Sequence, residues 1–150
     1  AHQAGLLLWR CWRMKQELLY WTLGLWGLLV VFAILNAMLR QGVLIPALGE
    51  SAGRAMSSVT LSVAILAMAY LFLSWSDIEC SASDLWLMGA IWVVLTVLFE
   101  FGFGHYVMGN SWDTLLADYN VFEGRIWVLV LVTEFLSPCL MGSLAERLGA

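Results

Sequence analysis

Glu134 is the residue of this chain whose type and position most suggest chemistry. It lies nine residues after Arg125 in an apolar segment at 124–144, which is about 13 Å along a helix axis at 1.5 Å per residue. In a bilayer this position is close to the midplane, where an ionised carboxylate is costly. We therefore expect Glu134 to be protonated, paired or facing water, and we expect Thr96, at a similar depth, to accept its proton in a hydrogen bond. Two interpretations stay open: a proton-relay group, or a neutral carboxyl that joins two helices.

A second group of polar residues lies at the ends of the apolar segments. Asn36 and Arg40 are four residues apart and share one helical face. An up-and-down topology brings Arg40 and Glu100 to one membrane face, and Arg125 opens the fourth segment there. We expect an Arg40–Glu100 ion pair that fixes helix register more than it adds stability, because desolvation offsets the attraction. The functional alternative is a polar pocket for an anionic headgroup or a small solute.

His105 follows a Phe-Gly-Phe-Gly run in which Gly102 and Gly104 let the backbone turn. With Glu100 and Asp113 near it in sequence, a metal or pigment ligand is one interpretation. A lipid-directed enzyme that uses these three side chains is another, but no nucleophile–base spacing accompanies them. A single interfacial His bonded to a backbone carbonyl is the more ordinary interpretation. We therefore predict neither a catalytic residue nor a metal ligand.

The remaining composition excludes several classes of protein. Lys15, the one lysine, precedes the first apolar segment and cannot form a retinal Schiff base within a bundle. The two histidines, His2 and His105, do not supply facing ligands for a transmembrane haem. A net charge of −4 without a basic patch excludes nucleic acid as a partner. We expect no cofactor, with a bound lipid as the open alternative.

Four long apolar stretches must position these side chains. Apolar residues make up 62% of the chain and charged residues 12%, with a mean hydropathy of +0.86. A typical soluble domain carries about 25% charged residues. Each stretch has the roughly 20 residues that cross a bilayer core of about 30 Å. We therefore predict one all-α integral membrane domain over 1–150, a four-transmembrane-helix bundle with spans at about 18–39, 57–75, 85–103 and 124–144.

The first stretch and the connections complete this prediction. The stretch at 18–39 is longer than a signal-peptide core, and we expect it to be retained as a span. The connection at 41–56 contains one proline and several glycines, which favour a structured loop. The connection at 76–84 is short and acidic, and Ser83 or Asp84 can cap the helix that follows.

The third connection, between the third and fourth spans, carries an amphipathic pattern. Ser111 precedes it as an N-cap candidate. Its apolar and aromatic side chains recur at three- and four-residue spacing: Trp112, Leu115, Leu116 and Tyr119. This pattern predicts a short helix lying in the membrane interface. The alternative is an ordinary amphipathic connector.

Orientation follows from the cationic residues at the segment ends. The side of the termini carries Arg10, Arg13, Lys15 and Arg147, and the other side carries Arg40, Arg54 and Arg125. The positive-inside tendency then places both termini in the cytoplasm. The connection at 76–84 argues the other way, because it would share that side and has neither Lys nor Arg.

Three pieces of the chain are similar to a known group of proteins. They are ILNAMLRQGVLIPALGE, FEFGFGHYVMGNSWDTLLADYN and GRIWVLVLVTEFLSP. The Asn-x-x-x-Arg of Asn36 and Arg40, the Phe-Glu-Phe-Gly-x-Gly run at 99–104 and the Leu-Leu-Ala-Asp-Tyr-Asn segment at 115–120 resemble a family of uncharacterised small four-helix bacterial integral membrane proteins. The resemblance implies a four-helix fold and a bacterial inner-membrane location. It implies no activity, substrate or catalytic residue.

Two functional hypotheses follow, neither of them enzymatic. The first is an accessory or structural subunit of a larger membrane assembly, because the chain combines apolar, Trp-rich faces with no catalytic signature. Its partners would be membrane lipids and other membrane proteins, or further copies of itself. The second is a small oligomeric transporter or channel component that uses Glu134 and the Arg40, Glu100 and Arg125 cluster.

Overall fold

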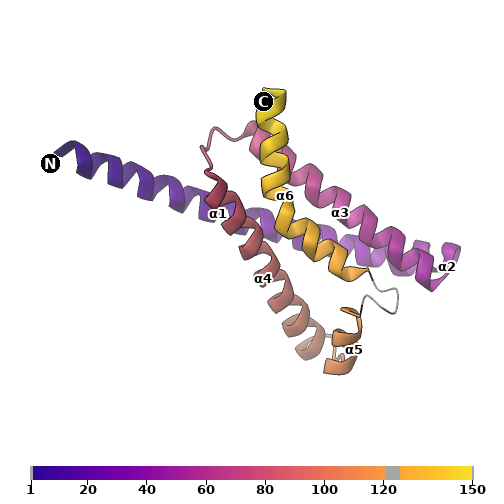
Figure 1. Cartoon of the computed structure of the whole chain (residues 1–150). Helices are drawn as coiled ribbons and strands as arrows, with labels where there is room; N and C mark the ends of the chain where they lie inside the picture. Colours follow the sequence, from indigo (N-terminus) through magenta and orange to yellow (C-terminus); the bar gives the residue numbers. More distant parts are fainter. Residues whose placement is uncertain (1, 121–125, 150) are drawn as a thin grey trace.

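The computed structural model describes residues 2–120 and 126–149, with side chains from residue 15 onward, and every regular element in these ranges is helical. In chain order the elements are α1 (His2–Leu39), the π-helix η1 (Arg40–Leu44), α2 (Ile45–Leu48), α3 (Glu50–Trp75), α4 (Ala82–Tyr106), α5 (Trp112–Ala117) and α6 (Trp127–Leu148) (Figure 1). Within the described ranges, four segments are long and apolar enough to cross a membrane: Lys15–Leu48, Glu50–Trp75, Ala82–Tyr106 and Trp127–Leu148. The all-α class and the four apolar helices are thus confirmed.

The loop predicted at 41–56 is wrong, because almost all of this segment is helical. Helix α1 continues through the π-helical turn η1 into α2, and Pro46, which lacks a backbone N–H, lies directly after this wider turn. The chain reverses at Gly49, whose φ of 85° favours glycine. At Gly53 a Cβ would lie 2.9 Å from the backbone nitrogen of Ile45, so this glycine lets α2 fold closely onto α3.

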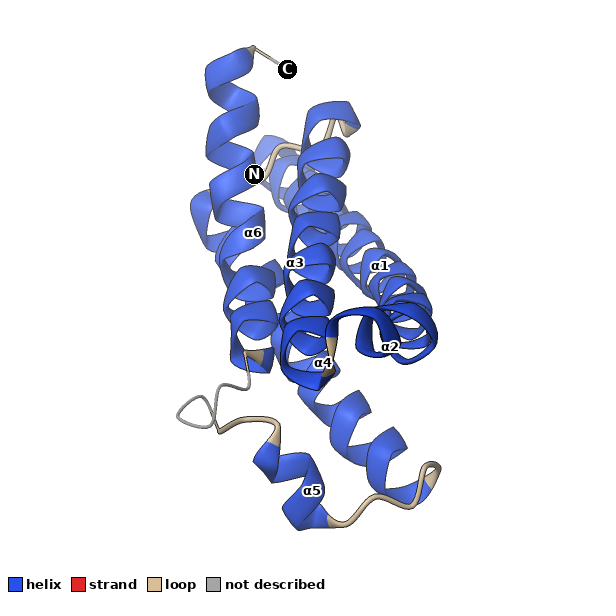
Figure 2. Ribbon diagram, turned by 90° about the vertical axis from the view of Figure 1, so that its right-hand side faces the viewer, coloured by secondary structure: helices blue, strands red, loops and turns tan. Residues whose placement is uncertain are grey.

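Hydrogen bonds between helices fix their relative directions. Trp92 Nε1 donates to the carbonyl of Thr22 at 2.9 Å, and Trp26 Nε1 donates to Thr96 Oγ1 at 3.1 Å. The residue numbers of the two bonded pairs rise together along α1 and α4. These two helices therefore run in the same direction, as predicted for the first and third spans. In Figure 2, α3 lies between α6 and α1.

The centre of the bundle is the packing of α3 and α4 against α6. On α4, a Cβ at Gly89 would collide with the carbonyl oxygen of Phe135, so the α4 and α6 backbones touch at this point. Trp92, which follows Gly89 by three residues on α4, is fully buried. Apolar side chains from four helices form the core: Leu25, Leu29, Leu61, Ile65, Met68, Ala69, Phe72, Met88, Trp92 and Val130.

Helix α4 begins with a capping box whose N-cap lies two residues before Ser83, the earlier of the two predicted caps. Ser81 is the N-cap, and its hydroxyl accepts the backbone N–H of Asp84 at 3.3 Å. The carboxylate of Asp84 in turn accepts the N–H of Ser81 at 3.0 Å. The prediction of Ser83 or Asp84 as N-cap is therefore wrong. Asp84 instead serves at the third helical position, which satisfies two N–H groups reciprocally.

Helix α5 and its cap confirm the helical pattern between the third and fourth apolar segments. Ser111 Oγ accepts the N–H of Thr114 at 3.2 Å. Leu115 is buried against α4, where a Cβ at Gly104 would lie 2.7 Å from its Cδ2. Leu116 is exposed, whereas the partly exposed Trp112 stacks on Phe101 and His105 of α4. Figure 1 shows α5 beside the end of α4.

Candidate functional site

Glu134 ends a chain of hydrogen bonds that links three helices. Its side chain lies on α6 and is 3% exposed. Its Oε1 accepts a hydrogen bond from Thr96 Oγ1 of α4 at 2.9 Å. The predicted partner is therefore confirmed, but the predicted direction is wrong, because Thr96 donates the hydrogen bond. Thr96 itself accepts from Trp26 Nε1 of α1. The other carboxyl oxygen of Glu134, Oε2, is buried and has no hydrogen-bond partner.

Trp26 was not a predicted site residue, although the sequence held a signal for it. It lies eight residues into the stretch at 18–39, whereas Trp in membrane proteins is enriched at the two interfaces. A Trp at mid-depth has an indole N–H that needs an acceptor inside the protein. Thr96 supplies that acceptor.

A crevice of about 290 Å³ runs between α1, α3, α4 and α6, and its wall includes both Glu134 and Arg40. At about 30 Å³ for each water-sized group, it holds roughly ten such groups. Ile34 and Phe103 belong to the wall and are partly exposed, so the crevice opens on the outer surface between α1 and α4. Most of the wall is apolar, as in Leu29, Ile34, Leu61, Phe99, Phe103 and Val130.

A smaller cavity of about 140 Å³ adjoins the polar end of the crevice, and the two share Arg40, Glu100 and Asp118 in their walls. Asn36 also lines it, and its Nδ2 donates to the carbonyl and hydroxyl oxygens of Ser57 at 3.0 and 2.8 Å. Two further polar atoms here are buried without a hydrogen-bond partner: Asn36 Oδ1 and Arg40 Nε.

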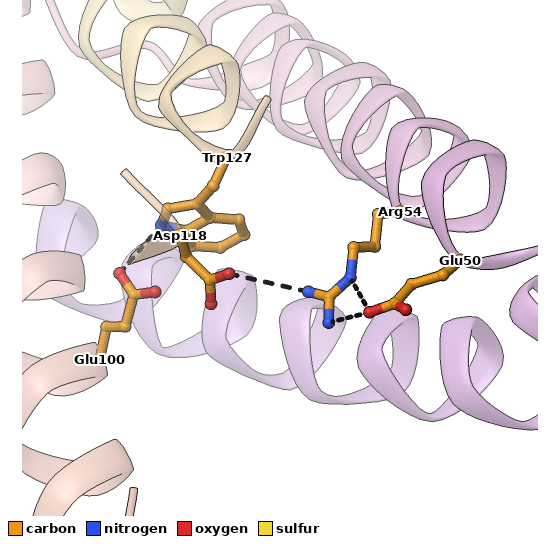
Figure 3. A network of polar contacts seen from close by, with 5 residues as sticks. All are labelled: Glu50, Arg54, Glu100, Asp118 and Trp127. Atoms are coloured by element: carbon orange, nitrogen blue, oxygen red, sulfur yellow. Dashed lines mark hydrogen bonds and ion pairs between the residues drawn. The ribbon is translucent and has the colours of Figure 1, made fainter. Parts of the chain in front are cut away.

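Arg54 joins α3 to the connection after α5. Figure 3 shows its guanidinium between two carboxylates. One is Glu50, at 3.1 Å from Nη2, and the other is Asp118, at 3.7 Å from Nη1. Asp118 also interacts electrostatically with Arg40, which lies near Arg54. The sequence placed Arg54 at this face of the bundle but in a loop, so its position on α3 was missed.

The predicted ion pair between Arg40 and Glu100 does not form in the described part of the chain. Glu100 Oε2 instead accepts the Tyr119 hydroxyl at 2.5 Å and Trp127 Nε1 at 2.9 Å (Figure 3 shows the Trp127 bond). Neutral donors from the start of α6 and from the segment after α5 therefore surround this carboxylate. The cluster retains Asn36, Arg40 and Glu100 around adjoining cavities, while Arg125 lies outside the described residues.

Tyr119 holds Glu100 from outside the long helices. Burial, together with the hydrogen bond to Glu100, raises the pKa of the Tyr119 hydroxyl above its usual value. The hydroxyl therefore stays protonated and remains a donor across the physiological pH range. Its ring stacks on Phe101 with the ring centroids 5.6 Å apart.

Replacing Tyr119 with Phe should lower the free energy of unfolding by about 1–3 kcal/mol, because Glu100 loses a hydrogen-bond donor. The stacking on Phe101 is retained, so the loss isolates the hydroxyl. Thermal unfolding in a mild detergent measures the change. Tyr106→Phe is the matched control, since Tyr106 is 79% exposed at the end of α4. Equal shifts for the two variants would contradict the assigned role of Tyr119.

His105 lies apart from the crevice. Its Nδ1 is 2.8 Å from the carbonyl oxygen of Asn110. Its ring stacks on Trp112 of α5 with the ring centroids 4.0 Å apart. This is the carbonyl-bonded arrangement that the sequence favoured, and the contact fastens α5 to the end of α4. The crevice and the small cavity do not include His105 in their walls.

Comparisons of the chain with protein families, curated proteins and solved structures found no match. The candidate site is therefore defined by its geometry alone.

Proposed function

We propose that this protein is a multi-pass membrane protein that binds an amphipathic, lipid-like molecule in the crevice between its helices. The four long apolar helices support insertion, since each is long enough for a bilayer core of about 30 Å. A bacterial inner membrane, cytoplasmic termini and an interfacial position of α5 stay predictions. The crevice opens between α1 and α4, on the surface that lipid would surround.

The observation that carries this proposal is a crevice with an apolar middle and unpartnered polar atoms at its two ends. Arg40 lines one end of the crevice and Glu134 the other, and Arg40 Nε and Glu134 Oε2 are both buried without a hydrogen-bond partner. A buried polar atom without a partner costs about 1–3 kcal/mol, so such atoms call for an explanation. A molecule with an apolar body and polar groups at both positions would fill the space and satisfy both atoms.

The bound molecule can be tested by native mass spectrometry after extraction in a mild detergent. We expect one tightly held amphipathic molecule with the wild-type protein. Ala37 lines both cavities, and Ala37→Phe should expel the molecule because the larger ring occupies its space. Val31→Phe, on the exposed face of α1, is the matched control. Wild-type protein that takes up no amphipathic molecule, even when lipid is added, would overturn the proposal.

A second candidate is a carrier that moves its ligand with a proton, and Glu134 favours it. A carboxyl at mid-depth in a bundle is a common element of proton-linked transport. Here it borders a crevice that opens to the surface of the bundle. The accessory-subunit role expected from the sequence stays a prediction, because the exposed apolar side chains of α1 suit lipid as well as a partner helix.

A further inference from the structure

We propose that the molecule in the crevice carries a carbonyl oxygen, and that the neutral carboxyl of Glu134 donates a hydrogen bond to it. This inference rests on the proposed function and names the chemistry of the ligand at the deep end of the crevice. Either an ester-linked lipid or a quinone can supply such a carbonyl.

The direction of the hydrogen-bond chain assigns the two oxygens of Glu134. An indole N–H can only donate, so Trp26 donates to Thr96 Oγ1. The single hydroxyl proton of Thr96 is then directed at Glu134 Oε1. Oε1 is therefore the acceptor of the carboxyl group. In the neutral acid the proton lies on Oε2, the oxygen without a partner.

The surroundings of Glu134 favour its neutral form. Its side chain is buried beside a crevice whose wall is mostly apolar, with Val130 and Phe99 in it. Within the described ranges, no Lys, Arg or His side chain forms an ion pair with Glu134. An ionised carboxylate without a paired cation is costly in such a place. Oε2 is then an O–H group, and the partner it lacks is an acceptor.

The polar end of the crevice also presents a donor. Arg40 Nε carries an N–H and no lone pair, so an acceptor oxygen must satisfy it. Glu134 is seven residues into α6 from Trp127, which is about 10 Å along the helix axis. A ligand that satisfies both ends therefore has acceptor oxygens at its head and again some way along its apolar part. Carbonyl oxygens accept without donating, and they meet this requirement.

The decisive comparison is between ester-linked and ether-linked phospholipids with the same headgroup and chains, since the ether lipid lacks carbonyls. We expect delipidated wild-type protein to prefer the ester lipid about tenfold in a competition followed by native mass spectrometry. Glu134→Gln should keep the preference, because the amide retains one acceptor and supplies N–H donors. Glu134→Leu should lose it. Glu146→Gln, exposed on the same helix, is the control.

A short-chain quinone distinguishes the two sources of the carbonyl. Displacement of the ester lipid by the quinone assigns the site to a quinone, and retention of the ester lipid assigns it to an acyl ester. Equal binding of ester and ether lipids without quinone displacement would overturn the inference and leave the proposed function standing. Loss of the preference in Glu134→Gln would overturn the neutral donor, and this test holds even where Glu134→Leu does not fold. Failure of all three molecules to bind would instead refute the proposed function.

Discussion

Replacing Trp92 with Ala should lower the free energy of unfolding by about 3–5 kcal/mol, the range found when a large buried aromatic is truncated. Trp92 is fully buried, and its indole N–H donates to the carbonyl of Thr22. The substitution therefore leaves a cavity and also removes a link between α4 and α1. Because these helices frame the crevice, we expect the variant to lose its bound molecule as well.

Trp92→Phe and Trp75→Ala separate the contributions in this experiment. Trp92→Phe keeps most of the apolar volume and removes the N–H, so we expect a loss of about 1–2 kcal/mol. Trp75 lies at the end of α3 and is 82% exposed, so its replacement by Ala should change stability by no more than about 0.5 kcal/mol. Reversible unfolding in mixed detergent micelles measures all three. A Trp92→Ala variant as stable as Trp75→Ala would contradict the packing of α4 against α1.

The long helices could be predicted from the sequence because apolar run length reports directly on the span of a helix. Their exact ends could not, since these depend on local backbone chemistry. Pro46 suggested a break, yet the helix continues past it, with a π-helical turn directly before the proline. The reversal depends on the positive φ of Gly49 and on the close approach of α2 to α3 at Gly53. Likewise, the capping box of Ser81 and Asp84 follows from where the helix begins, and a shift of the start by a residue changes which side chain caps it.

The sequence predicted a contact of the site only where the depth of two residues in the membrane was enough to pair them. Thr96 and Glu134 lie at similar depths on neighbouring antiparallel helices, and they form the expected pair, although Thr96 donates the hydrogen bond that it was expected to accept. The pairing of Arg40 with Glu100 required knowledge of which side chains surround each of them. Tyr119 reaches Glu100 only because α5 folds back against α4, a tertiary contact that helical spacing does not encode.

The two ends of the crevice therefore differ in how the fold supports them. At the polar end, neutral donors bind the carboxylate of Glu100, and Arg54 pairs with Glu50 and Asp118. The Nε of Arg40 has no hydrogen-bond partner. At the deep end, three helices contribute one side chain each to a chain of two hydrogen bonds that stops at Glu134. A purely structural carboxyl would gain from having both of its oxygens satisfied. The unsatisfied Oε2 favours a functional role beside a space that admits a ligand.

If the protein is a proton-linked carrier, Glu134→Gln should reduce transport at least tenfold while leaving ligand binding intact. The amide reproduces both hydrogen-bonding roles of the neutral carboxyl, but it cannot release a proton when the ligand leaves and water enters the crevice. A Glu134→Gln variant that binds the ligand but does not transport it would thus separate the hydrogen-bond donor role of Glu134 from a role in proton transfer.

Transport is measured in proteoliposomes as movement of a fluorescent ester lipid between leaflets, with and without a pH difference across the membrane. We expect the wild type to respond to the pH difference, and Glu134→Gln to be slow at every pH. Glu146→Gln, exposed on the same helix, should behave as the wild type. Unchanged transport in Glu134→Gln would refute proton-linked carriage. With binding retained, it would leave Glu134 as a hydrogen-bond donor in a site that holds its ligand without moving it.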